Sequence, residues 1–375
     1  MSDIERLLAD LIALPSVNPA FLPVSHPHAG EHRVSEYLGA KARRARLDVE
    51  LCEVAPNRVN VIARLRPPNK VTTRILLAPH LDTVNGATDQ FSPRKRNGRI
   101  FGRGACDTKG SVASMFLAIC DLARFGKRPS VTEIVFAGLV DEENAQAGSR
   151  SLGAAGMKAD LAIVGEPTRL QVVTAHKGSV WLELKTRGKS AHGARPELGK
   201  NAVHAMARVV DLLETKYAEQ LRSRTHPLLG CATVNVGTIQ GGTQPNIVPD
   251  GCEIKIDRRT LPGENESTVR REIQSILRLH NLRANLGTAK LEPCLPLETN
   301  PKLPLVSEFM RCTGQTKCLG VDYFCDASVL SQSGIPSVIF GPGDIAQAHT
   351  SEEWVSIKSL ERARKLLASY LRALP

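Results

Sequence analysis

The sequence predicts an α/β protein in which a mixed β-sheet flanked by helices forms one domain and a smaller α+β domain is inserted into it. The chain has 375 residues, more than one hydrophobic core usually holds, so two domains are expected. Strand-like and helix-like segments alternate up to about residue 176 and again after about residue 303, as in α/β domains. Residues 177–290 follow a different order, strand-helix-strand-strand-helix, which indicates the insert. We therefore expect residues 1–176 and 291–375 to form the first domain.

The first domain is expected to open with two helices, at 3–14 and 31–47. From residue 59 on, runs of branched apolar residues indicate strands, and the pair Asn97 and Gly98 between extended segments indicates a hairpin turn. The expected strands are VNVIARL, RILLAPHLDTV, VTEIVFAGLV, ADLAIVGEP and, after 303, SVIFG; the expected helices are SVASMFLAICDLARF, 149–156 and 357–373. This alternation predicts a largely parallel or mixed sheet with ligand sites at the carboxyl ends of its strands.

In the inserted segment, SVWLELKTRG is expected to form a strand and residues 200–221 a long helix. The apolar side of that helix is marked by Ala202, Val203, Met206, Val209, Val210 and Leu213. Two strands, ATVNVGTI and CEIKIDRRT, and a second helix at 266–280 complete the domain. The insert contains 18 Lys and Arg against 11 Asp and Glu, so it carries most of the net charge of +11. A basic surface of this kind attracts anionic small substrates.

Composition argues against a membrane protein and against a secreted one. No apolar stretch approaches the roughly 20 residues needed to cross a bilayer. The N-terminal MSDIERLLADLIAL has no basic region and no cleavage site of small residues, so no signal peptide is expected. Nine cysteines without CxxC spacing fit reduced thiols. We therefore expect a cytoplasmic protein without a membrane partner.

The positive charge also raises the question of nucleic-acid binding. The two densest basic runs are KARRAR (41–46), within a helical pattern, and PRKR (93–96), beside the expected hairpin turn. A solvated helix face and charged hairpin flanks account for both. Aromatic residues make up only 4% of the chain, too few for base stacking, and no nucleic-acid motif is present. A nucleic-acid partner is therefore not expected.

Several of the expected strands end at residues that can bind a metal ion. These strands are ILLAPHLD, IVFAGLVDEE, LAIVGE and SVIFGPGDIAQAH, and GRGACD adds a carboxylate before a helix. The residues concerned are His80, Asp82, Asp107, Asp141, Glu142, Glu143, Glu166 and His349. A single histidine or an Asp-Glu-Glu run after a strand can also be hydrogen-bonded or cap a helix. Independent caps have no reason to recur at the carboxyl ends of buried strands, so the joint pattern favours zinc or a similar divalent ion.

Six motifs along the chain resemble those of the di-zinc aminoacylase and deacylase metallopeptidase family. They are PHLDTV (79–84), GRGACDTKG (102–110), DEE (141–143), GEPT (165–168), SAHGARPELG (190–199) and AHTSEE (348–353). The family includes acetylornithine deacetylase, succinyl-diaminopimelate desuccinylase, aminoacylase-1 and carboxypeptidase G. The resemblance implies a catalytic domain of the zinc-dependent exopeptidase type and a lid domain that also carries a dimer interface. Residues 177–290 match that lid in position and size, so a homodimer is expected.

The resemblance implies five ligands for two zinc ions, for which cobalt could substitute. The implied ligands are His80 and Glu166 for one ion, Glu143 and His349 for the other, and Asp107 as the bridge between them. Asp82 would orient the imidazole of His80. Glu142 would act as general base, taking a proton from the attacking water and passing it to the departing amine. One of two adjacent glutamates would thus be held on the metal while its neighbour stays free to move a proton.

Three residues of the inserted domain match lid positions of the family. His192 would stabilise the oxyanion, in its own chain or in the partner subunit. Asn246 and Arg259 would bind the carboxylate of the substrate. Arg258 precedes Arg259, and since side chains alternate along a strand, only one of the two should face the site; the family pattern favours Arg259. Cys106, within GRGACD, is expected to be a packing residue rather than a nucleophile.

The substrate is expected to be an N-acyl amino acid. The segment GPGDIAQAHTSEEW is most similar to acetylornithine deacetylases, so an activity of that type is the first hypothesis. A succinyl-diaminopimelate desuccinylase or a broader N-acyl-amino-acid hydrolase is the next, and a dipeptidase or carboxypeptidase the third. Two hypotheses of other classes are a catalytically silent binding protein on the same fold and a nucleic-acid-binding protein. Measured zinc content discriminates an enzyme from the silent protein.

Overall fold

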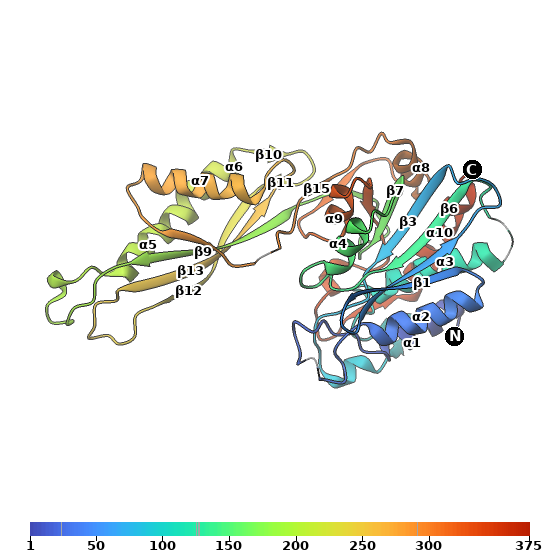
Figure 1. The fold of residues 1–375 in the computed structure, drawn as a ribbon, viewed down its shortest axis with the longest axis horizontal. Helices are drawn as coiled ribbons and strands as arrows, with labels where there is room; N and C mark the ends of the chain where they lie inside the picture. The colour runs from blue at the N-terminus through green and yellow to red at the C-terminus, as the bar shows by residue number, and fades with distance from the viewer. Residues whose placement is uncertain (24, 125, 127, 291) are drawn as a thin grey trace. The chain divides into compact units, whose positions relative to one another are not determined.

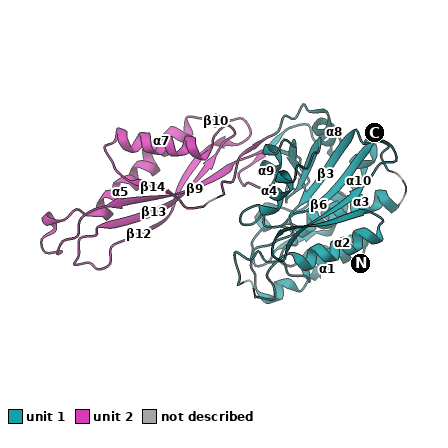
Figure 2. Cartoon of the chain, viewed as in Figure 1, with its two compact units in different colours: residues 1–174, 299–319, 325–375 teal, residues 175–298, 320–324 magenta. Residues whose placement is uncertain are grey.

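The computed structural model describes residues 1–23, 25–124, 126, 128–290 and 292–375. These residues form two compact units (Figure 2). Unit 1 comprises Met1–Thr174, Thr299–Leu319 and Cys325–Pro375, and unit 2 comprises Ala175–Glu298 and Gly320–Phe324. The sequence alone sets the boundaries at 177 and 290. Residues 292–298 and 320–324 belong to unit 2 because they pack on it, although their sequence continues the first domain.

The sheet of unit 1 is mixed, with parallel strands at its centre (Figure 1). Six of its strands follow the order β1-β2-β6-β3-β7-β17. The bounds are β1 Asp48–Ala55, β2 Arg58–Leu65, β3 Thr73–Pro79, β6 Thr132–Gly138, β7 Leu161–Gly165 and β17 Ser337–Ile339. β6, β3, β7 and β17 run parallel, whereas β2 pairs antiparallel with β6 and β1 with β2. The order β6-β3-β7 places the carboxyl ends of three strands side by side.

Helices cover this sheet, as the buried central strands require. They are α1 (Asp3–Ile12), α2 (His32–Arg44), α3 (Lys109–Arg124), α4 (Ala147–Ala154), α8 (Pro304–Thr313), α9 (Ala327–Gln332) and α10 (Ile357–Ala373). Every residue of β6 and β7 is buried, so both faces of these strands are covered. Phe116 of α3 meets Phe136 of β6 edge to face, with ring centroids 5.4 Å apart, and α3 packs on α1 and α10. The predicted mixed sheet flanked by helices is confirmed.

A small three-stranded sheet lies beside the main one and joins distant parts of unit 1. β4 (Arg94–Arg96) and β5 (Arg99–Phe101) form a hairpin, and β18 (Trp354–Ser356) pairs with the other side of β5. Asn97 and Gly98 both have positive φ, 50° and 70°, as the tightest hairpin turns require. The hairpin turn predicted there is present. The pairing of β18 with β5 brings the segment that carries His349 next to residues 99–107.

Unit 2 is built on a four-stranded antiparallel sheet in the order β12-β13-β9-β14. Its elements are β9 (Gly178–Arg187), α5 (Ala202–Leu212), a π-helical turn (Leu213–Tyr217), α6 (Ala218–Arg222), β12 (Thr233–Gly241), β13 (Gly251–Thr260), α7 (Glu266–Leu279) and β14 (Asn285–Thr288). Leu182, Leu184 and Ile254 of the sheet pack with Met206 and Ile273 of the helices. Alternate residues of β9 are exposed, so the helices cover one face of this sheet. The π-helical turn joins α5 to α6 within the long helix expected at 200–221.

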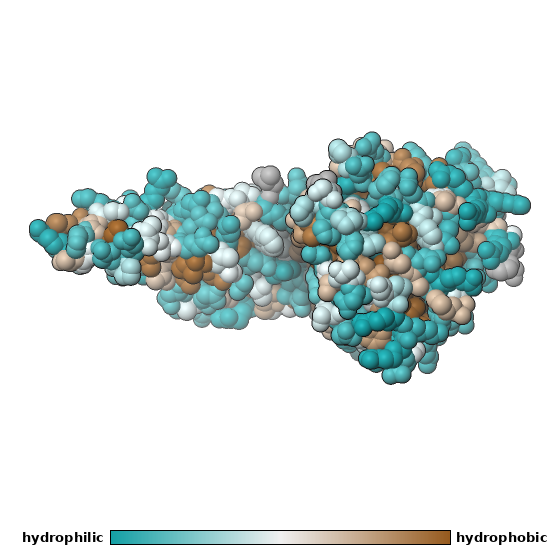
Figure 3. Space-filling view, turned by 90° about the horizontal axis from the view of Figure 1, so that it is seen from below, coloured by the Kyte–Doolittle hydropathy of each residue, from teal (hydrophilic) through white to brown (hydrophobic). Residues whose placement is uncertain are grey.

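Short strands complete the chain. They are β8 (Val173–His176), β10 (Thr225–His226), β11 (Gly230–Cys231), β15 (Leu297–Glu298) and β16 (Leu319–Val321). Within the described ranges, no helix is both long and apolar enough to cross a membrane. On the face that Figure 3 shows, hydrophobic residues lie in small groups among hydrophilic ones. Eight cysteines are free thiols: Cys52, Cys106, Cys120, Cys231, Cys252, Cys312, Cys318 and Cys325. The two basic runs lie at the end of α2 and in β4, as predicted.

Candidate active site

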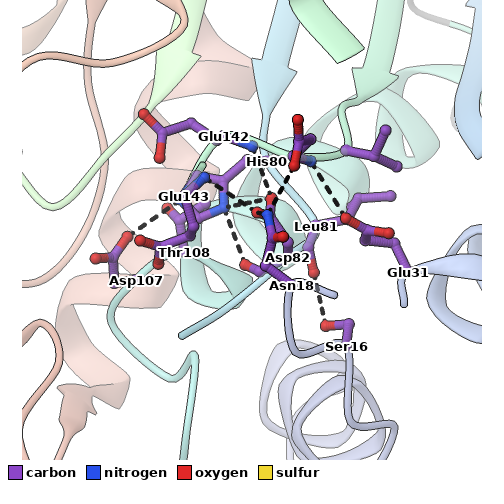
Figure 4. A network of polar contacts seen from close by, with 12 residues as sticks. Ser16, Asn18, Glu31, His80, Leu81, Asp82, Asp107, Thr108, Glu142 and Glu143 are labelled. Carbon is purple, nitrogen blue, oxygen red and sulfur yellow. Dashed lines mark hydrogen bonds and ion pairs between the residues drawn. The ribbon is translucent and has the colours of Figure 1, made fainter. Parts of the chain in front are cut away.

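Metal-capable side chains lie at the carboxyl ends of neighbouring strands and in two loops, and Figure 4 shows several of them close together. His80 directly follows β3, residues 141–143 follow β6, and Glu166 directly follows β7. Asp107 lies two residues before α3, and His349 lies in the loop between β17 and β18. Because β6, β3 and β7 are adjacent and parallel, their carboxyl ends meet at one edge of the sheet. Side chains far apart in the sequence thereby come together.

The carboxylate of Asp107 lies between two imidazoles. Its Oδ1 is 3.2 Å from Nε2 of His80, and its Oδ2 is 3.3 Å from Nε2 of His349. Nε2 of His349 is also 3.2 Å from the carboxylate of Glu143, and Nε2 of His80 is 3.9 Å from Oε1 of Glu166. Ligand atoms of His80, Asp107 and Glu143 all lie within 4.8 Å of one another. The five residues form one cluster in which Asp107 links the pair of His80 and Glu166 to the pair of Glu143 and His349.

The cluster has the chemistry of a divalent-cation site. Oε1 of Glu166 is buried and has no hydrogen-bond partner among the described residues. A buried carboxylate oxygen without a donor is costly unless a cation or a water molecule meets it. Imidazole and carboxylate are ligands that zinc and similar ions accept. The residues present therefore fit a divalent metal.

The electrostatics of the cluster also favour a cation. Burial raises the pKa of Glu142 well above its ordinary value, against His80, which lowers it, and the charge of Glu166 raises it further. Burial likewise raises the pKa of Glu166. Hydrogen bonds, above all with Asp107, raise the pKa of His349 to about 10. The raised pKa of His349 reflects the carboxylates around it, and burial makes the ionised forms of Glu142 and Glu166 costly; a bound cation would offset both effects.

Asp82 is fully buried and contacts His80, Glu142 and Glu143 (Figure 4). Nδ1 of His80 is 3.0 Å from the main-chain oxygen of Asp82 and 3.4 Å from its carboxylate. That carboxylate accepts hydrogen bonds from the main-chain nitrogens of Glu142 and Glu143, both at 3.1 Å, and from Nδ2 of Asn18 at 2.8 Å. One residue thus holds both the imidazole of His80 and the backbone of the two glutamates.

Asp141 binds a cationic side chain rather than joining the cluster. Its Oδ1 accepts hydrogen bonds from Nη1 of Arg58 at 2.7 Å and from Nδ2 of Asn18 at 2.9 Å. Arg58 also donates from Nε to Oε2 of Glu31, at 3.0 Å. Sequence reasoning did not single out Asn18, Glu31 or Arg58, because no local pattern marks residues that act through such distant contacts. Asp141 could bind a metal ion by its chemistry, but in this structure its carboxylate is paired with Arg58.

Cys106 packs beside the cluster as a neutral thiol. Its Sγ lies 3.3 Å from the main-chain oxygen of Asp344. Burial, with the nearby charge of Asp107, raises the pKa of the Cys106 thiol. A nucleophilic cysteine needs the opposite environment, one that stabilises the thiolate. The geometry agrees with the interpretation of Cys106 as a packing residue.

Arg258 and Arg259 face opposite sides of β13. Arg258 is fully buried, and its Nη2 lies 2.8 Å from Oε1 of Glu264. The side chain of Arg259 is 32% exposed, with Nε 2.9 Å from Oδ2 of Asp257. Its guanidinium lies 5.6 Å from the centre of the Phe324 ring. Of the two arginines, only Arg259 is accessible to a ligand.

His192 and Asn246 lie together in unit 2, apart from Arg259. The main-chain nitrogen of Gly193 donates to the main-chain oxygen of Asn246 at 2.7 Å. A Cβ atom on Gly193 would lie 2.8 Å from that oxygen, so the two loops need a glycine there. The side chain of His192 is exposed. Both loops lie beyond the Gly251 end of β13, whereas Arg259 lies near its other end, about 26 Å along the strand.

Comparison with known proteins shows the family of this chain and proteins of similar fold. The model of peptidase family M20/M25/M40 matches residues 76–373. The acetylornithine deacetylase of Myxococcus xanthus is 30% identical over 353 residues, which cover 89% of this chain and 88% of that protein. Among solved structures, the aminopeptidase PepT of Bacillus cereus superposes with a TM-score of 0.80 at 21% identity, covering 98% of this chain and 97% of that one. The YXEP protein of Bacillus subtilis, described as a dinuclear metal-binding peptidase of the M20 family, has a TM-score of 0.71 at 16% identity, covering 98% and 96%.

The fold and the clustered carboxylates and imidazoles define a class of protein, the metal-dependent hydrolases of amide bonds. Within that class, the match over residues 76–373 and the relative at 30% identity show the family. This chain belongs to peptidase family M20/M25/M40. The family that the six sequence motifs indicate is thereby confirmed.

Proposed function

We propose that this chain hydrolyses the amide bond of N-acyl amino acids, with N-acetylornithine as the first candidate substrate. The observation that carries the proposal is the carboxylate of Asp107 between the imidazoles of His80 and His349, with Glu142 close by. The similarity to acetylornithine deacetylases over most of the chain supports the choice of substrate.

The cluster would hold two zinc ions, for which cobalt could substitute. His80 and Glu166 would hold one ion and Glu143 and His349 the other, with Asp107 as the shared ligand. When bound, such a metal pair polarises the scissile carbonyl and lowers the pKa of water. The unpartnered oxygen of Glu166 supports this assignment, because a metal ion would satisfy it.

Glu142 would be the general base and then the general acid. Its neighbour Glu143 is engaged with His349 at 3.2 Å, whereas Glu142 interacts with the cluster through its charge. The carboxylate of Glu142 would take a proton from the attacking water and give it to the amide nitrogen as the C–N bond breaks. Burial raises the pKa of Glu142, and the charge of a bound cation would lower it again, so the group could first accept the proton and later release it.

Unit 2 would serve as lid and dimerisation domain. Arg259 would bind the substrate's carboxylate in its own chain, while His192 and Asn246 would reach the active site of the partner subunit. Their separation from Arg259, about 26 Å along β13, supports this division, because one small substrate cannot span it. Strand β12 is an edge strand, and the exposed Ile239 within it and Ile247 in the loop that follows it suit a homodimer contact. The cytoplasmic location expected from the sequence stays a prediction.

Hydrolysis of a panel of N-acetyl, N-succinyl and N-formyl amino acids, with added zinc or cobalt, tests the proposal. We expect cleavage that depends on the metal and is fastest for N-acetylornithine. Faster cleavage of a succinylated substrate would instead assign the desuccinylase activity, and cleavage of dipeptides alone a peptidase activity. Metal content measured on the same protein should be about two ions per chain. A chain that binds no metal and cleaves nothing would be a silent binding protein.

A further inference from the structure

Glu353 is a buried residue outside the cluster, and its carboxylate accepts hydrogen bonds from the loop that ends at Asp107. The side chain of Glu353 is 0% exposed, and that of Arg103 beside it is 4% exposed. Oε2 of Glu353 accepts hydrogen bonds from Nη1 of Arg103 at 2.7 Å and from the main-chain nitrogen of Gly104 at 3.0 Å. Oε1 accepts from the main-chain nitrogens of Cys106 at 2.8 Å and Asp107 at 3.0 Å. Four donors from one short loop therefore surround a single carboxylate.

This arrangement does more than satisfy a buried charge. Arg103 alone would neutralise Glu353, yet three further bonds come from successive parts of the loop backbone, the last from Asp107 itself. Each main-chain nitrogen is fixed relative to the same two oxygen atoms. The loop has little freedom to shift along or away from that carboxylate, because a shift would break several charge-assisted hydrogen bonds at once.

Glu353 also belongs to the segment that carries the other imidazole. His349 lies four residues before Glu353, and the main-chain oxygen of Glu353 accepts a hydrogen bond from the nitrogen of Gly102 at 3.0 Å. Nε2 of Gln90 adds bonds to the main-chain oxygens of Thr350 and Ser351, at 3.1 and 2.9 Å. The His349 segment and the Asp107 loop, 246 positions apart at the Glu353 contact, are thus held as one piece.

We propose that Glu353 is a positioning residue that sets Asp107 against His349 and so fixes the spacing of the two halves of the metal cluster. It touches neither substrate nor metal in this role. Its effect passes through the backbone of Asp107, whose Oδ2 lies 3.3 Å from Nε2 of His349. The inference rests on the proposed function, in which Asp107 is the shared ligand. Partners that orient metal ligands typically change metal affinity or activity about 10- to 100-fold when they are removed.

The neighbouring residue offers a matched control. Glu352 has a side chain 65% exposed, and its carboxylate lies 3.2 Å from Nη2 of Arg94, whose side chain is 52% exposed. Glu353→Gln and Glu352→Gln make the same chemical change one residue apart. In Glu353→Gln, the new amide group meets N–H donors where an acceptor is needed. Glu353→Asp keeps the charge but shortens the reach by one methylene, so it should rescue part of the effect.

The test is calorimetric titration of the metal-free full-length variants with Co²⁺, with the visible absorption of the bound ion as a second readout. We expect Glu353→Gln to bind Co²⁺ about 10- to 100-fold more weakly and to show an altered spectrum. Glu353→Asp should fall between, and Glu352→Gln should match the wild type. With a substrate that the wild type cleaves, Glu353→Gln should lower kcat and leave KM nearly unchanged.

Wild-type Co²⁺ affinity and spectrum in a folded Glu353→Gln chain would overturn the inference and leave the proposed function intact. If Glu353→Gln does not fold, Glu353→Asp decides in the same way. If neither folds, Glu353 serves the folding of unit 1 and the positioning role is wrong. A wild-type chain that binds no Co²⁺ would instead overturn the proposed function, and this inference with it.

Discussion

The carboxylate of Asp82 accepts a hydrogen bond from the main-chain nitrogen of Glu143, at 3.1 Å. Asp82 follows β3 and Glu143 follows β6, so this bond ties together the ends of two adjacent parallel strands. Asp82 also accepts from the main-chain nitrogen of Glu142. Asp82, which lies two residues after His80 in the sequence, therefore fixes the backbone from which the side chains of both glutamates project.

Substitutions of the adjacent residues Glu142 and Glu143 should have different effects, because the two side chains have different surroundings. Glu142→Ala should keep the fold and the bound metal but lower the rate of hydrolysis about 10²- to 10⁴-fold, the scale of a lost general base. Glu143→Ala should weaken metal binding, because its carboxylate lies 3.2 Å from Nε2 of His349 within the cluster. Metal content and kcat, measured on both variants, separate the two roles. Near-wild-type turnover in Glu142→Ala would rule out its assignment.

Substitutions of Arg258 and Arg259 in β13 should also have different effects. Arg259→Ala should raise KM for substrates with a free α-carboxylate much more than for their amides, because a charge-assisted bond to the carboxylate is lost. Arg258→Ala should instead lower the free energy of unfolding, by up to about 3–5 kcal/mol, because it removes a fully buried cation from its pair with Glu264 and leaves that carboxylate only the more distant Arg224, at 3.4 Å. Steady-state kinetics and chemical denaturation check the pair. Equal losses for acids and amides in Arg259→Ala would show that Arg259 is structural.

His192→Ala should keep the metal and lower kcat about 10²- to 10³-fold, more than it raises KM, if His192 stabilises the oxyanion. If the histidine acts in the partner subunit, mixed dimers of His192→Ala and Glu142→Ala chains should recover activity. Each mixed dimer would contain one site with both groups intact. Activity of the mixture is measured after chain exchange has been shown with labelled subunits. No recovery after such exchange would place the action of His192 within its own chain or nowhere.

The stability of the fold should fall in mild acid because of His176. Burial lowers the pKa of this histidine to about 4, against its hydrogen bond with the main-chain oxygen of Lys177, and its Nε2 has no partner among the described residues. The unfolded chain takes up the proton near pH 6.5, whereas the folded chain resists it until about pH 4. Protonation of His176 therefore leaves the free energy of unfolding unchanged above about pH 6.5. As the pH falls further, it lowers that free energy, by about 2 kcal/mol between pH 7 and pH 5.

Denaturation of the metal-free protein and of His176→Phe at both pH values measures that contribution. The variant should lack this part of the decrease, because a phenylalanine has no proton to gain. An identical loss of stability in the two proteins would show that other groups are responsible.

Features that depend on neighbours in the sequence were predictable. The hairpin at Asn97 and Gly98 follows from the need for positive φ at both turn residues. The strands before His80 and Glu166 follow from runs of branched apolar residues. Because ligand sites in α/β sheets lie at the carboxyl ends of strands, even the neighbourhood of the metal-capable residues could be anticipated.

The sequence by itself determined the mixed α/β architecture, the presence of an inserted unit and the types of side chain available for catalysis. Only the tertiary structure decided which of those side chains meet. It paired Asp141 with Arg58 instead of the cluster, buried Arg258 while leaving Arg259 accessible, and brought Glu353 to the loop of Asp107. The reason is physical: turn chemistry and hydrophobic periodicity act over a few residues, whereas a buried charge must find its partners wherever the packed chain places them.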